Sequence, residues 1–252
     1  MAGCTDFYPS QPMGKRCRAI LDLTRVNGLR GIAQSADGWR IGAATTWTDV
    51  IRAPLPAGFD GLKDAAREVG SVQIQNLGTL AGNLCNASPA ADGVPPLLTL
   101  EAVVEIASKG GVRRVPLAEF ITGVRSTALT PGEMVTALHI PEDAAQGTSA
   151  FLKLGSRKYL VISIAMVAVT LRLERGRIAQ ARVAVGACSP VARRLPDLET
   201  ALAGASVDDL PAMQAACFSA LDPVSDVRGS VAYRLDSVTE LCARAIRHAA
   251  GV

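Results

Sequence analysis

The stretch from Gln73 to Asp92, QIQNLGTLAGNLCNASPAAD, is the most informative part of the sequence. Within it, Gly78 to Asn83 (GTLAGN) combines glycine, threonine and asparagine, and a similar run lies at Ala2 to Asp6 (AGCTD). Glycine lets a backbone approach a ligand closely, while exposed N–H groups and short hydroxyls can face an anion. Two such loops predict a pyrophosphate site, although the spacing alone also fits ordinary turns. Asp92, after the second loop, could accept hydrogen bonds from a ribose or an adenine.

Composition places the chain among globular enzymes or enzyme subunits. At roughly 150 residues per domain, 252 residues predict one large domain or two packed ones. An apolar content of 49% with 19% charged residues excludes a disordered chain. The net charge of +3 is too small to indicate nucleic-acid binding. The longest apolar run, Leu160 to Leu171, is too short to cross a bilayer and predicts a buried strand or helix.

Residues with catalytic or metal-binding chemistry are sparse. The six cysteines are at least 13 residues apart, which excludes C-x-x-C knuckles and contiguous iron–sulfur ligation. We expect most of them to be reduced thiols in apolar surroundings. His139 and His248 lack metal-ligand spacing and are expected to be structural or surface residues. Rossmann, P-loop, zincin and hydrolase-elbow motifs are absent from the sequence, and so is a secretory signal, so a cytoplasmic protein is expected.

Periodicity predicts an α+β fold in two parts. Strand-like runs at Ala102 to Ala107 and Val112 to Val115 predict a hairpin, and Leu62 to Val69 has helical spacing. The polar, turn-rich segment from Pro141 to Gly147 predicts a boundary, with parts at 1–145 and 146–252. The second part is expected to hold two long strands, at 161–173 and 177–185, and helices at 197–203, 211–221 and 231–250.

The stretch from Gln73 to Asp92 resembles the FAD-binding subunit of molybdenum hydroxylases, the xanthine dehydrogenase and aerobic carbon monoxide dehydrogenase family. The resemblance extends along the whole chain, through segments such as RIGAATTW at 40–47, FLKLGSR at 151–157 and DPVSDVRGS at 222–230. It implies a two-part FAD-binding domain of the molybdopterin dehydrogenase (PCMH) type followed by a smaller α+β domain.

The resemblance also implies which residues hold the cofactor, and it implies no catalytic acid, base or nucleophile in this chain. Asp92 would bind the ribityl or adenosine side, and Lys153 would lie near the flavin edge, where a cation favours the reduced ring. Val69 and Val135 would pack on the flavin, although a solvated lysine and core valines would look the same in the sequence. The first phosphate loop would comprise Ala2, Gly3, Cys4, Thr5 and Asp6, and the second Thr79, Gly82, Asn83 and Asn86.

Three features depart from the family pattern. Cys4 and Ala81 stand where relatives usually have glycine, which predicts loops less able to adopt a positive φ or to allow a ligand to approach closely. The resemblance further implies a strand and a helix before the first loop, whereas this sequence starts with that loop at Met1. We therefore expect a chain without that strand and helix to retain FAD less well.

The implied function is electron transfer. A partner molybdopterin subunit would oxidise substrate, a partner iron–sulfur subunit would relay electrons, and FAD in this chain would reduce an acceptor such as NAD, a quinone or oxygen. Two alternatives are a flavin-free scaffold subunit of the same complex and a stand-alone flavin oxidase. The sequence contains no signal that identifies the substrate.

Overall fold

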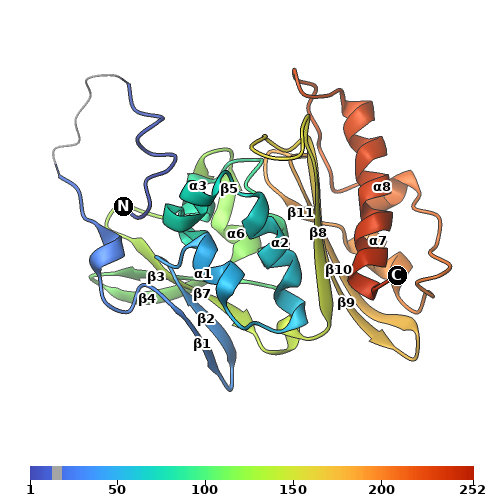
Figure 1. Cartoon of the computed structure of the whole chain (residues 1–252), viewed down its shortest axis with the longest axis horizontal. Helices are drawn as coiled ribbons and strands as arrows, with labels where there is room; N and C mark the ends of the chain where they lie inside the picture. Colours follow the sequence, from blue (N-terminus) through green and yellow to red (C-terminus); the bar gives the residue numbers. More distant parts are fainter. Residues whose placement is uncertain (13–18) are drawn as a thin grey trace.

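The computed structural model describes residues 1–12 and 19–252, and Cys17 lies outside this range. Its elements form four layers, in which two β-sheets alternate with two groups of helices (Figure 1). Helix and strand content is mixed, as expected for an α+β protein. None of the helices in the described part of the chain has both the length and the apolar character needed to cross a bilayer.

The first sheet has five strands in the order β1-β2-β7-β3-β4, all antiparallel to their neighbours. The predicted hairpin at 102–115 is confirmed as β3–β4. A separate two-stranded ribbon, β5–β6, lies outside this sheet. The strands are β1 (Ile32–Ser35), β2 (Gly38–Gly42), β3 (Val103–Ser108), β4 (Gly111–Pro116), β5 (Ile121–Gly123), β6 (Ser126–Thr127) and β7 (Met134–Pro141).

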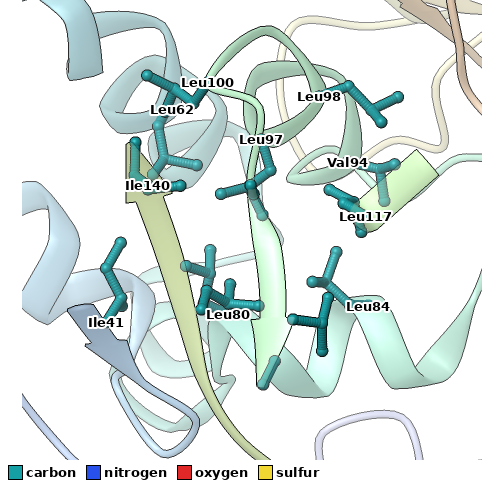
Figure 2. Close-up of a cluster of buried hydrophobic side chains, with 14 of the residues drawn as sticks. Ile41, Leu62, Leu80, Leu84, Val94, Leu97, Leu98, Leu100, Leu117 and Ile140 are labelled. Carbon is teal, nitrogen blue, oxygen red and sulfur yellow. The ribbon is translucent and has the colours of Figure 1, made fainter. Parts of the chain in front are cut away.

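Six helices form the layer between the two sheets, and all of them except α3, which has no buried residue, contribute side chains to the main core. Apolar side chains from these helices meet the inner face of the first sheet, where Ile41 and Ile140 face Leu62, Leu80 and Leu97 (Figure 2). The predicted helix at 62–69 is confirmed within α2. The helices are α1 (Trp47–Arg52), α2 (Asp60–Glu68), α3 (Val72–Leu77), α4 (Leu80–Asn86), α5 (Val94–Thr99) and α6 (Leu117–Phe120). Short 3₁₀ turns occur at Leu23–Arg25, Ala57–Phe59 and Asp143–Ala145.

The second sheet has the order β11-β10-β9-β8 and lies between two helical layers. Helices α2 and α5 pack on one face and α7 and α8 on the other, and Figure 1 shows α2 on the side opposite to α7 and α8. Its core includes three free, buried cysteines, Cys188, Cys217 and Cys242, in apolar surroundings as expected. The elements are β8 (Thr148–Leu154), β9 (Ala165–Glu174), β10 (Arg177–Gly186), β11 (Arg193–Arg194), α7 (Pro196–Leu202), a 3₁₀ turn (Ala215–Phe218) and α8 (Val231–Ala250).

Two expectations for the second part are wrong in detail. The first long strand starts at Ala165 rather than at residue 161, because Leu160 adopts a left-handed φ of 52° and Ile162 is exposed. The segment 211–221 holds one 3₁₀ turn instead of a helix. That turn has no side-chain cap, and burying Cys217 and Phe218 requires no further turns. Alanine-rich composition is a weak prior that tertiary packing overrides.

Candidate functional site

Both small-residue loops lie on the wall of one cavity of about 340 Å³. This volume is within the usual range for sites that bind small molecules. All the predicted site residues line it except Asp92, Val135 and Lys153. The lining comprises Met1, Ala2, Gly3, Cys4, Thr5, Asp6, Phe7, Trp47, Val69, Ile74, Gly78, Thr79, Gly82, Asn83, Cys85 and Asn86.

The first loop, Ala2 to Asp6, is irregular backbone that rests on the end of α3. A Cβ added at Gly3 would lie 1.8 Å from the carbonyl oxygen of Leu77, so only glycine allows this approach. Cys4 follows with a left-handed φ of 58°, which is strained for a residue other than glycine. The departure from glycine at Cys4 therefore falls at a position where glycine would be favoured.

Most of the second loop, from Leu80 to Asn83, is the first turn of α4. The Thr79 hydroxyl caps this helix, since its Oγ1 accepts a hydrogen bond of 3.0 Å from the backbone N–H of Gly82. The N–H of Leu80 donates to the carbonyl of Thr45 at 3.0 Å, which ties the loop to the start of α1. Ala81 is helical and buried in the main core, so its replacement of glycine causes no backbone strain. The expectation that Ala81 occupies a position needing a positive φ is therefore wrong.

A side-chain hydrogen bond joins the two loops across 80 residues of sequence. The Asn86 Nδ2 donates to Asp6 Oδ2 at 2.8 Å. One turn earlier in α4, the Oδ1 of Asn83 accepts from the backbone N–H of Gly93 at 3.3 Å. Thr5 lies near Gly78, because a Cβ added at Gly78 would be 3.5 Å from the Thr5 hydroxyl. The polar wall of the cavity is thus one connected arrangement rather than two independent turns.

The rest of the lining is apolar, and sequence reasoning missed most of it. Only Val69 was predicted, whereas Phe7, Trp47 and Ile74 were not. Trp47 is 1% exposed, and its ring would lie 2.5 Å from a Cβ added at Gly93. A signal was available, because Thr46 to Asp49 (TWTD) forms a capping box that places Trp47 at the first turn of α1.

Asp92 and Lys153 form a buried ion pair outside the cavity lining. The Lys153 Nζ donates to Asp92 Oδ2 at 2.7 Å, and the Ser163 hydroxyl donates to Asp92 Oδ1 at 2.9 Å. The two charged side chains are 9% or less exposed. Burial raises the pKa of Asp92, and its two donors oppose this rise by favouring the carboxylate. This pair connects the segment after α4 to β8.

Val135 and the two histidines also lie away from the cavity. Val135 is a buried residue of β7 within the main core. His139 has an acidic neighbour that the sequence did not indicate, since its Nε2 lies 2.7 Å from Glu105 Oε2 on the adjacent strand. Although burial opposes it, hydrogen bonds from His139, Thr136 and Arg40 lower the pKa of Glu105 to about 2. In the described residues no group of three His, Cys, Asp or Glu side chains is placed to hold a metal ion.

Comparison with protein-family models matches both parts of the chain. Residues 1–143 match the FAD binding domain in molybdopterin dehydrogenase. Residues 150–249 match the CO dehydrogenase flavoprotein C-terminal domain. The chain belongs to the FAD-binding subunits of the molybdenum hydroxylase family. It is accordingly a subunit of an oxidoreductase, and the resemblance found in the sequence is confirmed.

Individual relatives support the same assignment. This FAD-binding subunit is 33% identical to the xanthine dehydrogenase FAD-binding subunit of Escherichia coli, over 99% of this chain and 87% of the relative. It is 29% identical to the carbon monoxide dehydrogenase medium chain of Hydrogenophaga pseudoflava, over 91% of this chain and 81% of that one.

The fold matches solved structures along its whole length. A carbon monoxide dehydrogenase structure from Hydrogenophaga pseudoflava superposes with a TM-score of 0.87 and 26% identity, covering 100% of this chain and 88% of the other. Quinoline 2-oxidoreductase from Pseudomonas putida gives a TM-score of 0.87 at 27% identity, with the same coverage. The two-part FAD-binding fold is therefore confirmed.

Proposed function

We propose that this subunit holds one FAD noncovalently in the cavity between the two loops and relays electrons from partner iron–sulfur clusters to an acceptor. The observation that carries the proposal is the convergence of the loops. Ala2–Asp6 and Gly78–Asn86 are far apart in sequence, yet they line one cavity and are joined by the hydrogen bond between Asp6 and Asn86.

The residues present fit an amphipathic dinucleotide. The close approach of Gly3 to Leu77 and the hydroxyl and amide groups of Thr5, Asn83 and Asn86 provide a polar wall of small groups. Backbone N–H groups in such loops bind phosphate without a lysine or arginine. Phe7, Trp47, Val69 and Ile74 supply an apolar wall for a ring system. Bound FAD supplies the redox chemistry, while these residues bind it, orient it and exclude water.

We assign supporting roles to the three predicted site residues that lie outside the cavity lining. Lys153 has two N–H donors besides the one that Asp92 accepts, so it can still favour a negatively charged ring near the flavin edge. Asp92 fixes the position of that lysine and continues directly from the second loop. Val135 supports the site from the core beneath it. We propose 1–145 as the cofactor-binding part and 146–252 as the part that carries Lys153.

The proposed partners are an iron–sulfur small subunit and a molybdopterin large subunit, in the cytoplasm. The relative from Hydrogenophaga pseudoflava is named a medium chain, which supports a place between a small and a large partner. Substrate would be oxidised on the partner, and the acceptor would be NAD, a quinone or oxygen. None of the residues that line the cavity is assigned a role in acid–base or nucleophilic catalysis.

A flavin-free scaffold subunit is the second candidate, and the strained Cys4 in the first loop is the observation that favours it. The absorption spectrum of the purified chain, alone and with its partners, separates the two. We expect flavin absorption equal to one FAD per chain, released by acid and bleached on reduction. A chain that lacks flavin both alone and in its complex, and that takes up none from added FAD, would contradict the proposal. Substrate-dependent turnover by the chain alone would instead favour a stand-alone oxidase.

A further inference from the structure

Arg125 lies in the tight turn between β5 and β6 and covers the end of α4. Its backbone has a left-handed φ of 57°, and its N–H donates to the carbonyl of Ala87 at 2.9 Å. Its guanidinium donates to the backbone carbonyl of Asn86 at 3.1 Å and also to Asn86 Oδ1. Arg125 does not line the cavity, but it binds a residue that does.

This contact sets the orientation of the Asn86 amide. A guanidinium has only donors, so it accepts no bond from the Nδ2 group and pairs with Oδ1. The Nδ2 group is thereby turned toward the first loop, where it donates to Asp6 Oδ2 at 2.8 Å. A flipped amide would place a donor against Arg125 and an acceptor against Asp6, and it would lose both hydrogen bonds.

The three side chains form a row of cation, amide and carboxylate. Hydrogen bonds with a charged partner are stronger than those between neutral groups, and both bonds of this amide have one. The row spans from the β5–β6 turn, across α4, to the first loop. Asp6 is the last residue of that loop, and Gly3 makes a second close contact, on the end of α3.

We propose that Arg125 is a positioning residue of the flavin site. It acts through Asn86 on Asp6 and holds the first loop in the conformation that lines the cavity. The expected effect of Arg125 on FAD affinity rests on the proposed function. Its expected effect on the order of the first loop does not, because that order can be measured in the flavin-free chain.

The first experiment compares Arg125→Gln with the parent in the full chain. We expect FAD affinity, measured by titration of flavin fluorescence, to fall about three- to tenfold, the effect of losing one or two hydrogen bonds. In the flavin-free chain we expect faster hydrogen–deuterium exchange at residues 2–8, with exchange in β9 and β10 unchanged. Arg125→Lys keeps a cationic donor and should recover part of both effects.

The control is Arg114→Gln. Arg114 is also exposed, lies on β4 and has its guanidinium 3.9 Å from Glu105, away from the cavity lining. We expect parent-like FAD affinity and exchange in this variant. Unchanged exchange at residues 2–8 in Arg125→Gln would overturn the inference. If exchange rises as expected but neither parent nor variant binds FAD, the proposed function fails while the positioning role stands.

A polarity swap gives a second, independent test. Asn86→Asp alone places two carboxylates side by side, and we expect a loss of FAD affinity of about tenfold and faster exchange at residues 2–8. Adding Asp6→Asn restores opposite polarity, because the carboxylate at position 86 then accepts from both Arg125 and the amide at position 6. The double variant should exchange at residues 2–8 within about threefold of the parent. Losses that simply add in the double variant would overturn the coupling.

Discussion

The two loops that line the cavity have similar composition but are stabilised differently. The second loop is a capped helix whose residues Leu80, Ala81 and Leu84 belong to the main core. The first loop has irregular backbone and a left-handed Cys4, and it is only partly buried. It is held mainly by the close approach of Gly3 to Leu77 and by the Asp6–Asn86 hydrogen bond. The second loop is therefore part of the fold, whereas the first rests on the fold's surface.

This difference predicts that changes near the second loop reduce global stability, while changes in the first loop reduce ligand binding alone. The largest expected effect is at Lys153, whose ion pair with Asp92 fixes the segment after the second loop. Lys153→Met leaves a buried carboxylate without its cation. The free energy of unfolding, measured by urea denaturation, should fall by about 3–5 kcal/mol.

The pH dependence and two control variants test this cause. Burial already raises the pKa of Asp92, and Lys153→Met removes the cation that opposes the rise. A carboxyl group whose pKa is raised by folding destabilises the folded state above its unfolded pKa, so the loss should shrink as pH falls toward 4. Adding Asp92→Asn removes the buried charge and should recover most of the loss. The exposed Lys158→Met should change stability by less than about 0.5 kcal/mol, and a similar loss there would contradict the ion-pair explanation.

The next largest effect is expected in the first loop, at Gly3. Gly3→Ala would place a Cβ 1.8 Å from the Leu77 carbonyl oxygen, so the loop must move away from the cavity. FAD affinity should fall at least about a hundredfold, equivalent to about 2.7 kcal/mol, while the urea midpoint of the flavin-free chain stays within error. A matching loss of stability in the flavin-free chain would show that the first loop is as integral to the fold as the second.

The contrast between the loops also explains what sequence reasoning could and could not predict. The second loop was recognisable as a candidate site because its glycine, threonine and asparagine lie within one short stretch, although the helix at Leu80–Asn86 was not predicted from the sequence. The Asp6–Asn86 bond and the Asp92–Lys153 pair join residues 80 and 61 positions apart, so no local pattern indicates them. Trp47 is different, because the capping box at Thr46 to Asp49 is a local signal for its helix position. Only its contact with Gly93 has no local signal, since that contact is set by how α1 packs.

The overall architecture was predictable where the periodicity was long and regular. The hairpin at 102–115 and the helix at 231–250 both have clear patterns, and both occur in the structure. The prediction of a helix at 211–221 was wrong. Alanine-rich composition favours a helix but does not indicate that only Cys217 and Phe218 of this turn are buried. The left-handed φ values of Cys4 and Arg125 were not predictable, because neither residue type favours that conformation.

Gly82 should combine both effects, with a smaller loss of stability than Lys153→Met. Its backbone is helical rather than left-handed, so the reason to keep glycine there is space, since a Cβ would lie 2.7 Å from the Thr79 hydroxyl. Gly82→Val should displace the capping hydroxyl and reduce the free energy of unfolding by about 1–2 kcal/mol, and it should also abolish flavin absorption in the purified protein. Equal flavin content in variant and parent would remove Gly82 from the site.

The smallest effects are expected from two glycine substitutions, one of which should be favourable and the other unfavourable. Cys4 is left-handed, so Cys4→Gly should relieve about 1 kcal/mol of strain in the ordered loop and tighten FAD binding by up to about fivefold. Ala81 is helical, so Ala81→Gly should instead lower the free energy of unfolding by about 1 kcal/mol. Flavin titration and urea denaturation of both variants give the comparison.

If restoring glycine improved flavin binding at both positions, the family pattern would reflect a shared need for close approach to the ligand. Opposite outcomes would show that glycine is needed for backbone conformation in the first loop and is dispensable in the second, where the helix provides that conformation.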